Sequence, residues 1–149
     1  MDKQLVEEGQ TIALPDGRSL GYLEVGEGKP VLYFHGIPTS RLDVLLLKEI
    51  AQSRHLRIIG VDRPGFGLST FAHRKSLRDF VADIDFLVDS LHIGKFALLG
   101  WSAGGPHLIT YAALFPERVT CALVVGSVSM PCEVRTIDRL IVKIPSIGI

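Results

Sequence analysis

The sequence predicts an α/β protein with a mostly parallel sheet, helices on both faces and an N-terminal antiparallel hairpin. Two observations carry this prediction. Short apolar runs typical of buried strands alternate with segments of helical periodicity, and the connections between them are short. The first two β-patterned segments are instead separated by a turn signal, which indicates a hairpin. Because parallel strands are normally buried on both sides, we expect helices above and below the sheet.

The N-terminal elements follow from these patterns. The hairpin is predicted from residues 11–16 and 19–26, joined through an Asp-Gly turn signal. The apolar run VLYF at 31–34 follows as a buried strand. A helix is predicted over 41–54 because apolar residues recur there at helical spacing, namely Leu42, Leu45, Leu46 and Ile50.

The remaining elements continue the alternation. A buried strand at 57–62 is followed by a helix whose apolar stripe comprises Phe80, Ile84, Leu87, Val88 and Leu91. We expect Gly94 to end this helix as its left-handed C′ residue. Strands at 95–100 and 120–126 then flank a helix at 103–115.

Composition narrows the function classes. The chain has 149 residues, of which 47% are hydrophobic and 21% charged, as in an ordinary globular domain. Lys+Arg and Asp+Glu both number 16, so no basic excess favours nucleic acid or a membrane surface. Cys121 and Cys132 form no CxxC pair, and we identify no signal peptide or membrane-spanning run. A cytoplasmic protein without metal or cofactor is therefore expected.

Polar residues that follow parallel strands should gather at one edge of the sheet, where such folds bind ligands. The residues that follow strands are His35, Asp62, Ser102, Ser127 and Ser129, and His73 lies in a connection leaving the same edge. His55 and His92 precede strands and belong to the opposite edge.

The stretch GWSAGG, residues 100–105, predicts a nucleophile. Ser102 lies between glycines where a buried strand gives way to a helix, and the helix N-terminus offers free N–H groups and positive dipole. Phosphate binding is an alternative, but the lysine of a P-loop is missing and the glycine spacing of a dinucleotide site fails. An inert glycine-rich turn is the other alternative.

Three motifs together, HGIP at 35–38, DRPGFG at 62–67 and GWSAGG, resemble those of the α/β-hydrolase fold superfamily, in its lid-bearing, non-lipase branch. The resemblance implies that Ser102 is the nucleophile and that the backbone N–H groups of Ile37 and Ala103 form the oxyanion hole. It implies a small-molecule substrate carrying an ester, thioester, lactone, amide or cleavable C–C bond.

Other conspicuous residues receive smaller roles. By resemblance His35 braces the oxyanion loop, and it is also considered with Trp101 as a substrate contact. Asp62 and Arg63 look like loop anchors. His107 lies one turn beyond Ser102, and its side chain is expected to point away from that serine.

The resemblance also implies a triad in the order serine, acid, histidine, and two of its members are not found. After Ser102 the only histidine is His107, and the acids are Glu117, Glu133 and Asp138, none of which is placed as the resemblance requires. We interpret residues 1–130 as the N-terminal part of a C-terminally incomplete hydrolase core and 131–149 as the start of a lid.

Two hypotheses follow. In the first, the chain belongs to a serine hydrolase that works through an acyl-enzyme on Ser102, with the acid and histidine supplied from elsewhere. In the second, it is a non-catalytic truncated α/β-hydrolase domain, a binding module or pseudoenzyme remnant. In both, the apolar segment 121–129 is expected to form an exposed strand edge that supports self-association.

Overall fold

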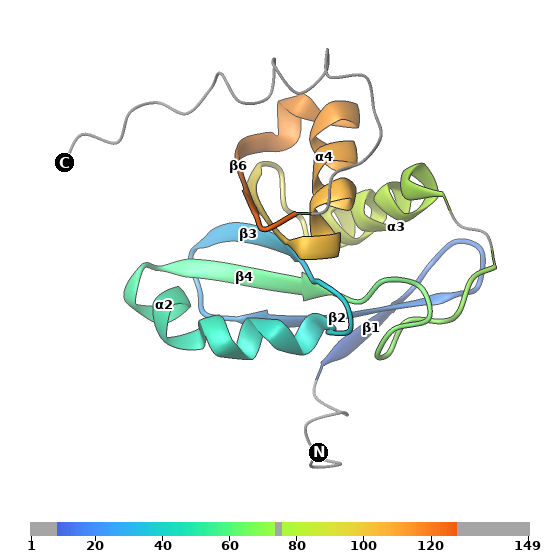
Figure 1. The fold of residues 1–149 in the computed structure, drawn as a ribbon, viewed down its shortest axis with the longest axis horizontal. Coiled ribbons are helices and arrows are strands. Elements are labelled where there is room, and N and C mark those ends of the chain that lie inside the picture. The colour runs from blue at the N-terminus through green and yellow to red at the C-terminus, as the bar shows by residue number, and fades with distance from the viewer. Residues whose placement is uncertain (1–8, 74–75, 128–149) are drawn as a thin grey trace.

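The computed structural model describes residues 9–73 and 76–127. Its centre is one six-stranded sheet with the order β1-β2-β4-β3-β5-β6 (Figure 1). The strands are β1 Gln10–Ala13, β2 Ser19–Val25, β3 Lys29–Phe34, β4 Leu56–Val61, β5 Phe96–Trp101 and β6 Val119–Val125.

Strand pairing confirms the predicted fold class. β1 and β2 form the antiparallel hairpin, and β2 pairs with β4 antiparallel. The pairs β3–β4, β3–β5 and β5–β6 are all parallel. The carboxyl ends of these four strands therefore meet at one edge of the sheet.

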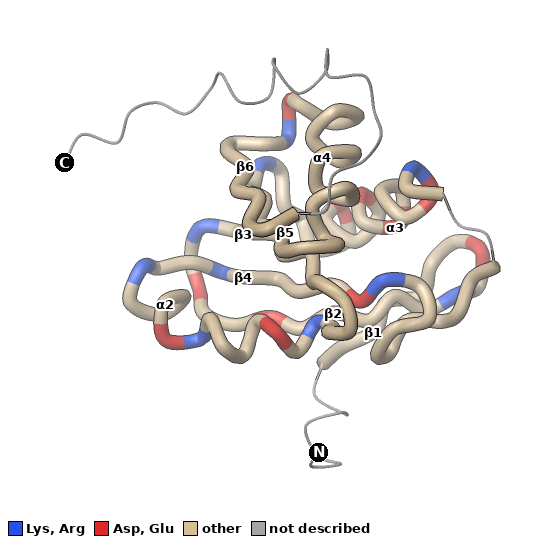
Figure 2. The backbone as a smooth tube through the Cα atoms, in the orientation of Figure 1, with Lys and Arg blue, Asp and Glu red and all other residues tan. Residues whose placement is uncertain are grey.

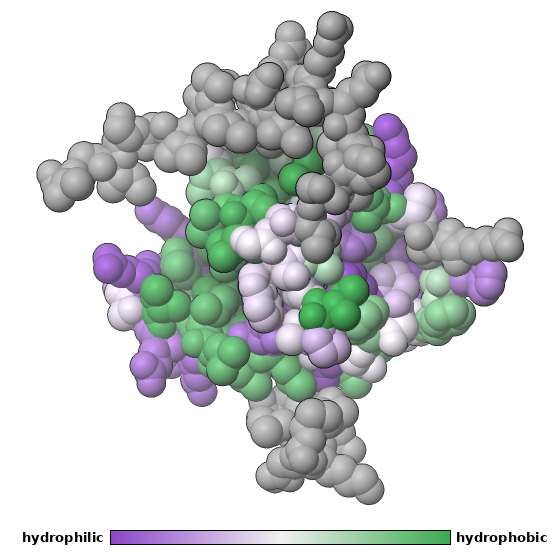
Figure 3. All heavy atoms as spheres, viewed as in Figure 1, coloured by the Kyte–Doolittle hydropathy of each residue, from purple (hydrophilic) through white to green (hydrophobic). Residues whose placement is uncertain are grey.

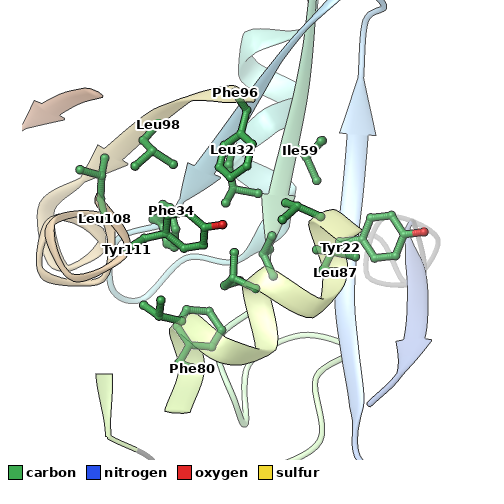
Figure 4. Packing of buried hydrophobic residues seen from close by; sticks show 14 of the residues in the cluster. Tyr22, Leu32, Phe34, Ile59, Phe80, Leu87, Phe96, Leu98, Leu108 and Tyr111 are labelled. Carbon is green, nitrogen blue, oxygen red and sulfur yellow. The ribbon is translucent and has the colours of Figure 1, made fainter. Parts of the chain in front are cut away.

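Helices cover both faces of the sheet (Figure 1). The 3-10 helix η1 Arg41–Leu47 and the helix α2 Lys48–Ser53 pack on one face. The helices α3 Leu77–Ser90 and α4 Gly105–Leu114 pack on the other, with short 3-10 turns η2 Ser102–Gly104 and η3 Pro116–Arg118 at the ends of α4. The larger core lies between the sheet and the α3–α4 layer, where Phe80 and Tyr111 meet Leu32 and Leu98 (Figure 4).

The helix predicted over 41–54 is instead a 3-10 helix followed by a short α-helix. With three residues per turn, Arg41 and Val44 lie on one face of η1, and both are buried. This face contacts β4 closely at Gly60, where a Cβ would come within 2.6 Å of the Val44 side chain. The close approach of η1 to β4 accounts for the tighter turn.

Helix α3 begins with a capping box and ends two residues earlier than expected. The Ser76 side chain accepts from the Asp79 N–H, and the Asp79 carboxylate accepts from the Ser76 N–H. At the C-terminus His92, at a φ of 56°, takes the left-handed position, and the next N–H, of Ile93, donates to the Val88 carbonyl. The expectation that Gly94 fills this position is therefore wrong.

Acidic and basic residues are dispersed along the described chain in Figure 2, whereas β5, η2 and α4 carry none. Among the described residues, no helix has the length and apolarity that crossing a bilayer requires.

Candidate active site

Ser102 lies on the sharp turn between β5 and α4, half-buried, at the edge where the parallel strands end. Its φ of 51° is in the left-handed region, which residues with a Cβ rarely adopt. The sequence predicted such strain from the glycine–serine–glycine spacing, and the backbone confirms it. Strained backbone of this kind is typical of a serine that must project from a strand-to-helix turn.

The glycines around Ser102 permit this turn. A Cβ on Gly104 would stand 2.0 Å from the carbonyl oxygen of Phe34, and one on Gly100 would stand 3.0 Å from the Leu108 side chain. Gly105 is equally constrained, because a Cβ there would meet the Ser127 hydroxyl at 2.0 Å. The same Cβ would lie 3.1 Å from the Val124 side chain, so the turn is packed against both neighbouring strands, β3 and β6.

The segment after β3 lies directly beside Ser102. A Cβ on Gly36 would be 3.4 Å from the Ser102 Cβ and 3.3 Å from the Trp101 ring. Ile37 follows Gly36, and Ala103 follows Ser102. The fold therefore brings together the serine and the two backbone segments that, according to the resemblance, would form an oxyanion hole.

His35 is locked in the interior behind this segment, with only 1% of its surface exposed. Its Nε2 accepts from the Arg63 backbone N–H at 3.2 Å, so the ring proton of the neutral form is on Nδ1, which donates to the Gly36 carbonyl at 2.8 Å. Burial, and then the charge of Arg63, lower the pKa of His35 to about 4. This burial does not fit the substrate-contact role considered for His35, whereas Trp101 is 44% exposed.

Arg63 was expected to be only a loop anchor, but its side chain also contacts the segment that follows β3. Its Nη2 donates to the Gly36 carbonyl at 2.6 Å, and its guanidinium lies over the Phe66 ring, 4.6 Å from the centroid. Burial lowers the pKa of Arg63. Its Nε has no hydrogen-bond partner among the residues that the structure describes. Only the three-dimensional contact with Gly36 distinguishes Arg63 from an ordinary loop arginine, so the sequence carried no signal for it.

Asp62 anchors the loop that follows β4, as the sequence suggested. Its carboxylate is fully buried and accepts from the backbone N–H and Nη1 of Arg41, both at 2.8 Å, and from the Leu68 N–H at 2.8 Å. It therefore joins η1 to the loop and is not available to a substrate.

The remaining candidates lie around this edge. The His107 ring packs edge-on against Phe80 of α3 at 5.1 Å, and burial lowers its pKa to about 4. His73 is exposed beside Phe71. Ser127 reaches the first turn of α4, whereas Ser129 and the predicted lid start at 131–149 lie outside the described residues.

Within residues 9–73 and 76–127 no three His, Cys, Asp or Glu side chains gather in an arrangement that could hold a metal ion.

Known proteins resemble most of the chain. A 2-hydroxy-6-oxo-2,4-heptadienoate hydrolase from Pseudomonas putida is 29% identical over 126 residues, which cover 82% of this chain and 46% of that protein. An esterase from Exiguobacterium antarcticum superposes with a TM-score of 0.72 at 27% identity, covering 80% of this chain and 45% of the esterase. An epoxide hydrolase from Vigna radiata superposes with a TM-score of 0.75 at 25% identity, covering 85% of this chain and 42% of the epoxide hydrolase.

The chain thus spans about half the length of the curated relatives it matches. The sequence profile of the alpha/beta hydrolase fold matches residues 29–146, which is most of the chain. With its parallel sheet, strained serine turn and neighbouring glycine loop, the chain belongs to the α/β-hydrolase fold family.

Proposed function

We propose that this chain carries the nucleophile and oxyanion hole of a serine hydrolase. The observation that carries the proposal is the left-handed backbone of Ser102, held against the segment that contains Ile37. Ser102 Oγ would attack a carbonyl carbon of a small substrate, and the Ala103 and Ile37 N–H groups would stabilise the resulting oxyanion. The leaving group would depart to give an acyl-enzyme on Ser102.

The substrate class is an ester or a C–C bond next to a carbonyl. An esterase and the P. putida hydrolase are among the relatives, and a serine nucleophile fits both kinds of reaction. The exposed Trp101, next to the nucleophile, is the described side chain best placed to contact the acyl group.

The base and acid of the triad would come from outside these residues. A serine hydroxyl needs a base within hydrogen-bond reach, and the buried His35 and His107 rings are engaged elsewhere or held with a low pKa. We therefore expect no turnover of p-nitrophenyl acetate by the 149-residue chain alone. A non-catalytic domain is the second candidate, and an open reading frame or its absence beyond codon 149 separates the two.

A cysteine tests the nucleophile position without requiring a base. In a background with Cys121 and Cys132 replaced by serine, Ser102→Cys is treated with p-nitrophenyl acetate. The thiolate attacks the ester carbonyl, p-nitrophenolate leaves and the acetyl group stays on sulfur. The N-terminus of α4 should lower the pKa of this thiol and the oxyanion donors should speed its acylation.

The matched control is Ser90→Cys in the same background, at the C-terminal end of α3, where the helix dipole has the opposite sign. We expect faster acetylation at position 102, with a lower pH midpoint. Equal rates at the two positions would contradict the proposal, because the turn would then offer no activation.

A further inference from the structure

The carbonyl oxygen of Gly36 is held by two side-chain donors from the protein interior. Nδ1 of His35 lies 2.8 Å from it, and Nη2 of Arg63 lies 2.6 Å from it. Both donors are buried side chains. A carbonyl oxygen has two lone pairs, so these two donors can occupy both acceptor positions of the Gly36 oxygen.

The direction of this carbonyl determines the direction of the next N–H. The Gly36–Ile37 peptide is trans, and in a planar trans peptide the C=O and N–H bonds point in opposite directions. Two donors pulling the Gly36 oxygen inward therefore turn the Ile37 N–H outward. Hydrogen bonds to the oxygen also polarise the peptide and strengthen the N–H as a donor.

The contacts of Arg63 with described residues compensate only in part for the burial of its charge. Among the described residues Arg63 forms no ion pair with a carboxylate, and its Nε has no hydrogen-bond partner. Such a charge costs free energy when it is desolvated. The contact with Phe66 offsets only part of that cost, as cation–π contacts contribute about 0.5–2 kcal/mol.

We propose that Arg63 is a positioning residue that, together with His35, clamps the Gly36–Ile37 peptide so that the Ile37 N–H points at the oxyanion. What this N–H is used for rests on the proposed function, but its orientation is a property of the chain itself. His35 contributes through its other nitrogen as well, because Nε2 accepts from the Arg63 backbone N–H and so fixes the proton on Nδ1.

Nuclear magnetic resonance of Arg63→Met tests the clamp without requiring turnover. The variant removes the charged donor and keeps an apolar stem of similar reach. We expect the Ile37 amide proton to move upfield and the residual dipolar coupling of the Ile37 N–H to change, while the couplings of β3 and β5 are retained. A purely structural role would disturb these strands as much as Ile37.

Arg57→Met is the matched control, because Arg57 lies near the start of β4, the strand that leads to Arg63, and its side chain binds Glu24 instead of Gly36. We expect no change at Ile37 in this variant. Arg63→Lys, which keeps a cationic donor, should partly restore the Ile37 signal. If Arg63→Met does not fold, two other measurements test the clamp. One is the Ile37 amide signal of Arg63→Lys. The other is the carbonyl carbon resonance of Gly36 in the unchanged chain, which we expect downfield of the carbonyl resonances of other glycines.

An Ile37 amide that is the same in folded Arg63 variants, or an ordinary Gly36 carbonyl resonance, overturns the clamp. The two proposals fail separately. Slow acylation of Ser102→Cys with an Ile37 amide that depends on Arg63 would contradict the proposed function and support the clamp. Fast acylation of Ser102→Cys with an Ile37 amide that does not depend on Arg63 would support the function and overturn the clamp.

Discussion

Gly104 lies so close to Phe34 that a Cβ on the glycine would stand 2.0 Å from the Phe34 carbonyl oxygen. Phe34 is the last residue of β3, and Gly104 is two residues beyond Ser102. This contact fixes the height of the serine turn above the sheet. It also sets its distance from Gly36, because Gly36 follows Phe34 by only two residues. The absence of a Cβ at Gly104 thus allows the serine turn and the segment containing Gly36, which together form the candidate site, to lie next to each other.

Gly104→Ala should therefore destabilise the fold strongly. The clash is with backbone, which cannot move aside as a flexible side chain can, so we expect a loss of about 3 kcal/mol or more in the free energy of unfolding. Urea unfolding measures it. Gly94→Ala is the control, because a Cβ there meets nothing within 4 Å, and its effect should stay within about 1 kcal/mol. Equal effects of the two changes would contradict the close contact.

The strain at Ser102 predicts that removing its Cβ stabilises the protein. A left-handed residue with a Cβ costs about 1–2 kcal/mol, and glycine's extra freedom in the unfolded chain offsets part of that relief. We expect Ser102→Gly to raise the free energy of unfolding by about 0.5–1 kcal/mol. Ser102→Ala keeps the Cβ and should change it little. A glycine variant less stable than the alanine variant would argue against strain at this turn.

Local patterns predicted the strands and the serine turn, because both depend on residues adjacent in sequence. Short apolar runs require burial, and Gly100, Ser102 and Gly104 are spaced as a tight turn requires. A strained backbone at Ser102 could therefore be predicted, and the strain takes the form of a left-handed φ of 51°.

Long-range pairing could not be predicted in this way. Arg41 was expected on an ordinary helix, but its partner Asp62 lies 21 residues further along the chain, and the pair draws the arginine into the interior. The contact of Arg63 with Gly36 spans 27 residues and depends on where β3 and β4 end in space. His92 took the helix-ending position from Gly94 because Ile93 is drawn into the core.

The buried histidines predict loss of stability in mild acid. In the folded protein the pKa of His35 is about 4, below its usual 6.5, so the folded state binds fewer protons than the unfolded state between these values. The stability from the neutral ring is complete above pH 6.5 and is lost as the pH falls to about 4. The slope of the unfolding free energy approaches about 1.4 kcal/mol per pH unit for each such histidine.

Substituting each histidine separates its contribution to the pH dependence of stability from that of carboxylates that titrate in the same pH range. Since the pKa of His107 is also lowered to about 4, His35→Asn and His107→Asn should each flatten the slope between pH 6.5 and 4. Urea unfolding at a series of pH values measures the slopes. If neither variant flattens the slope, the two rings are not held neutral by burial.

Strand β6 is an edge of the described sheet. Leu123, Val124 and Val125 are large apolar side chains with 60%, 38% and 45% of their surface exposed. In Figure 3 apolar side chains gather where Figure 1 places this strand. Parallel strands are normally buried on both faces, and no strand within residues 9–73 and 76–127 pairs with the outer edge of β6.

We therefore propose that the chain self-associates through this edge, over residues 121–127 of the expected segment 121–129, since unpaired strand edges with apolar side chains template association. Val124→Lys should raise the monomer fraction, because a charge on an edge strand opposes pairing. Leu46→Lys is the matched control: Leu46 is 85% exposed, but it lies on η1 against the opposite part of the sheet. Sedimentation velocity at several concentrations gives the monomer fraction. A chain that is already monomeric at the highest concentration, or that Leu46→Lys dissociates equally well, would show that β6 is not the interface.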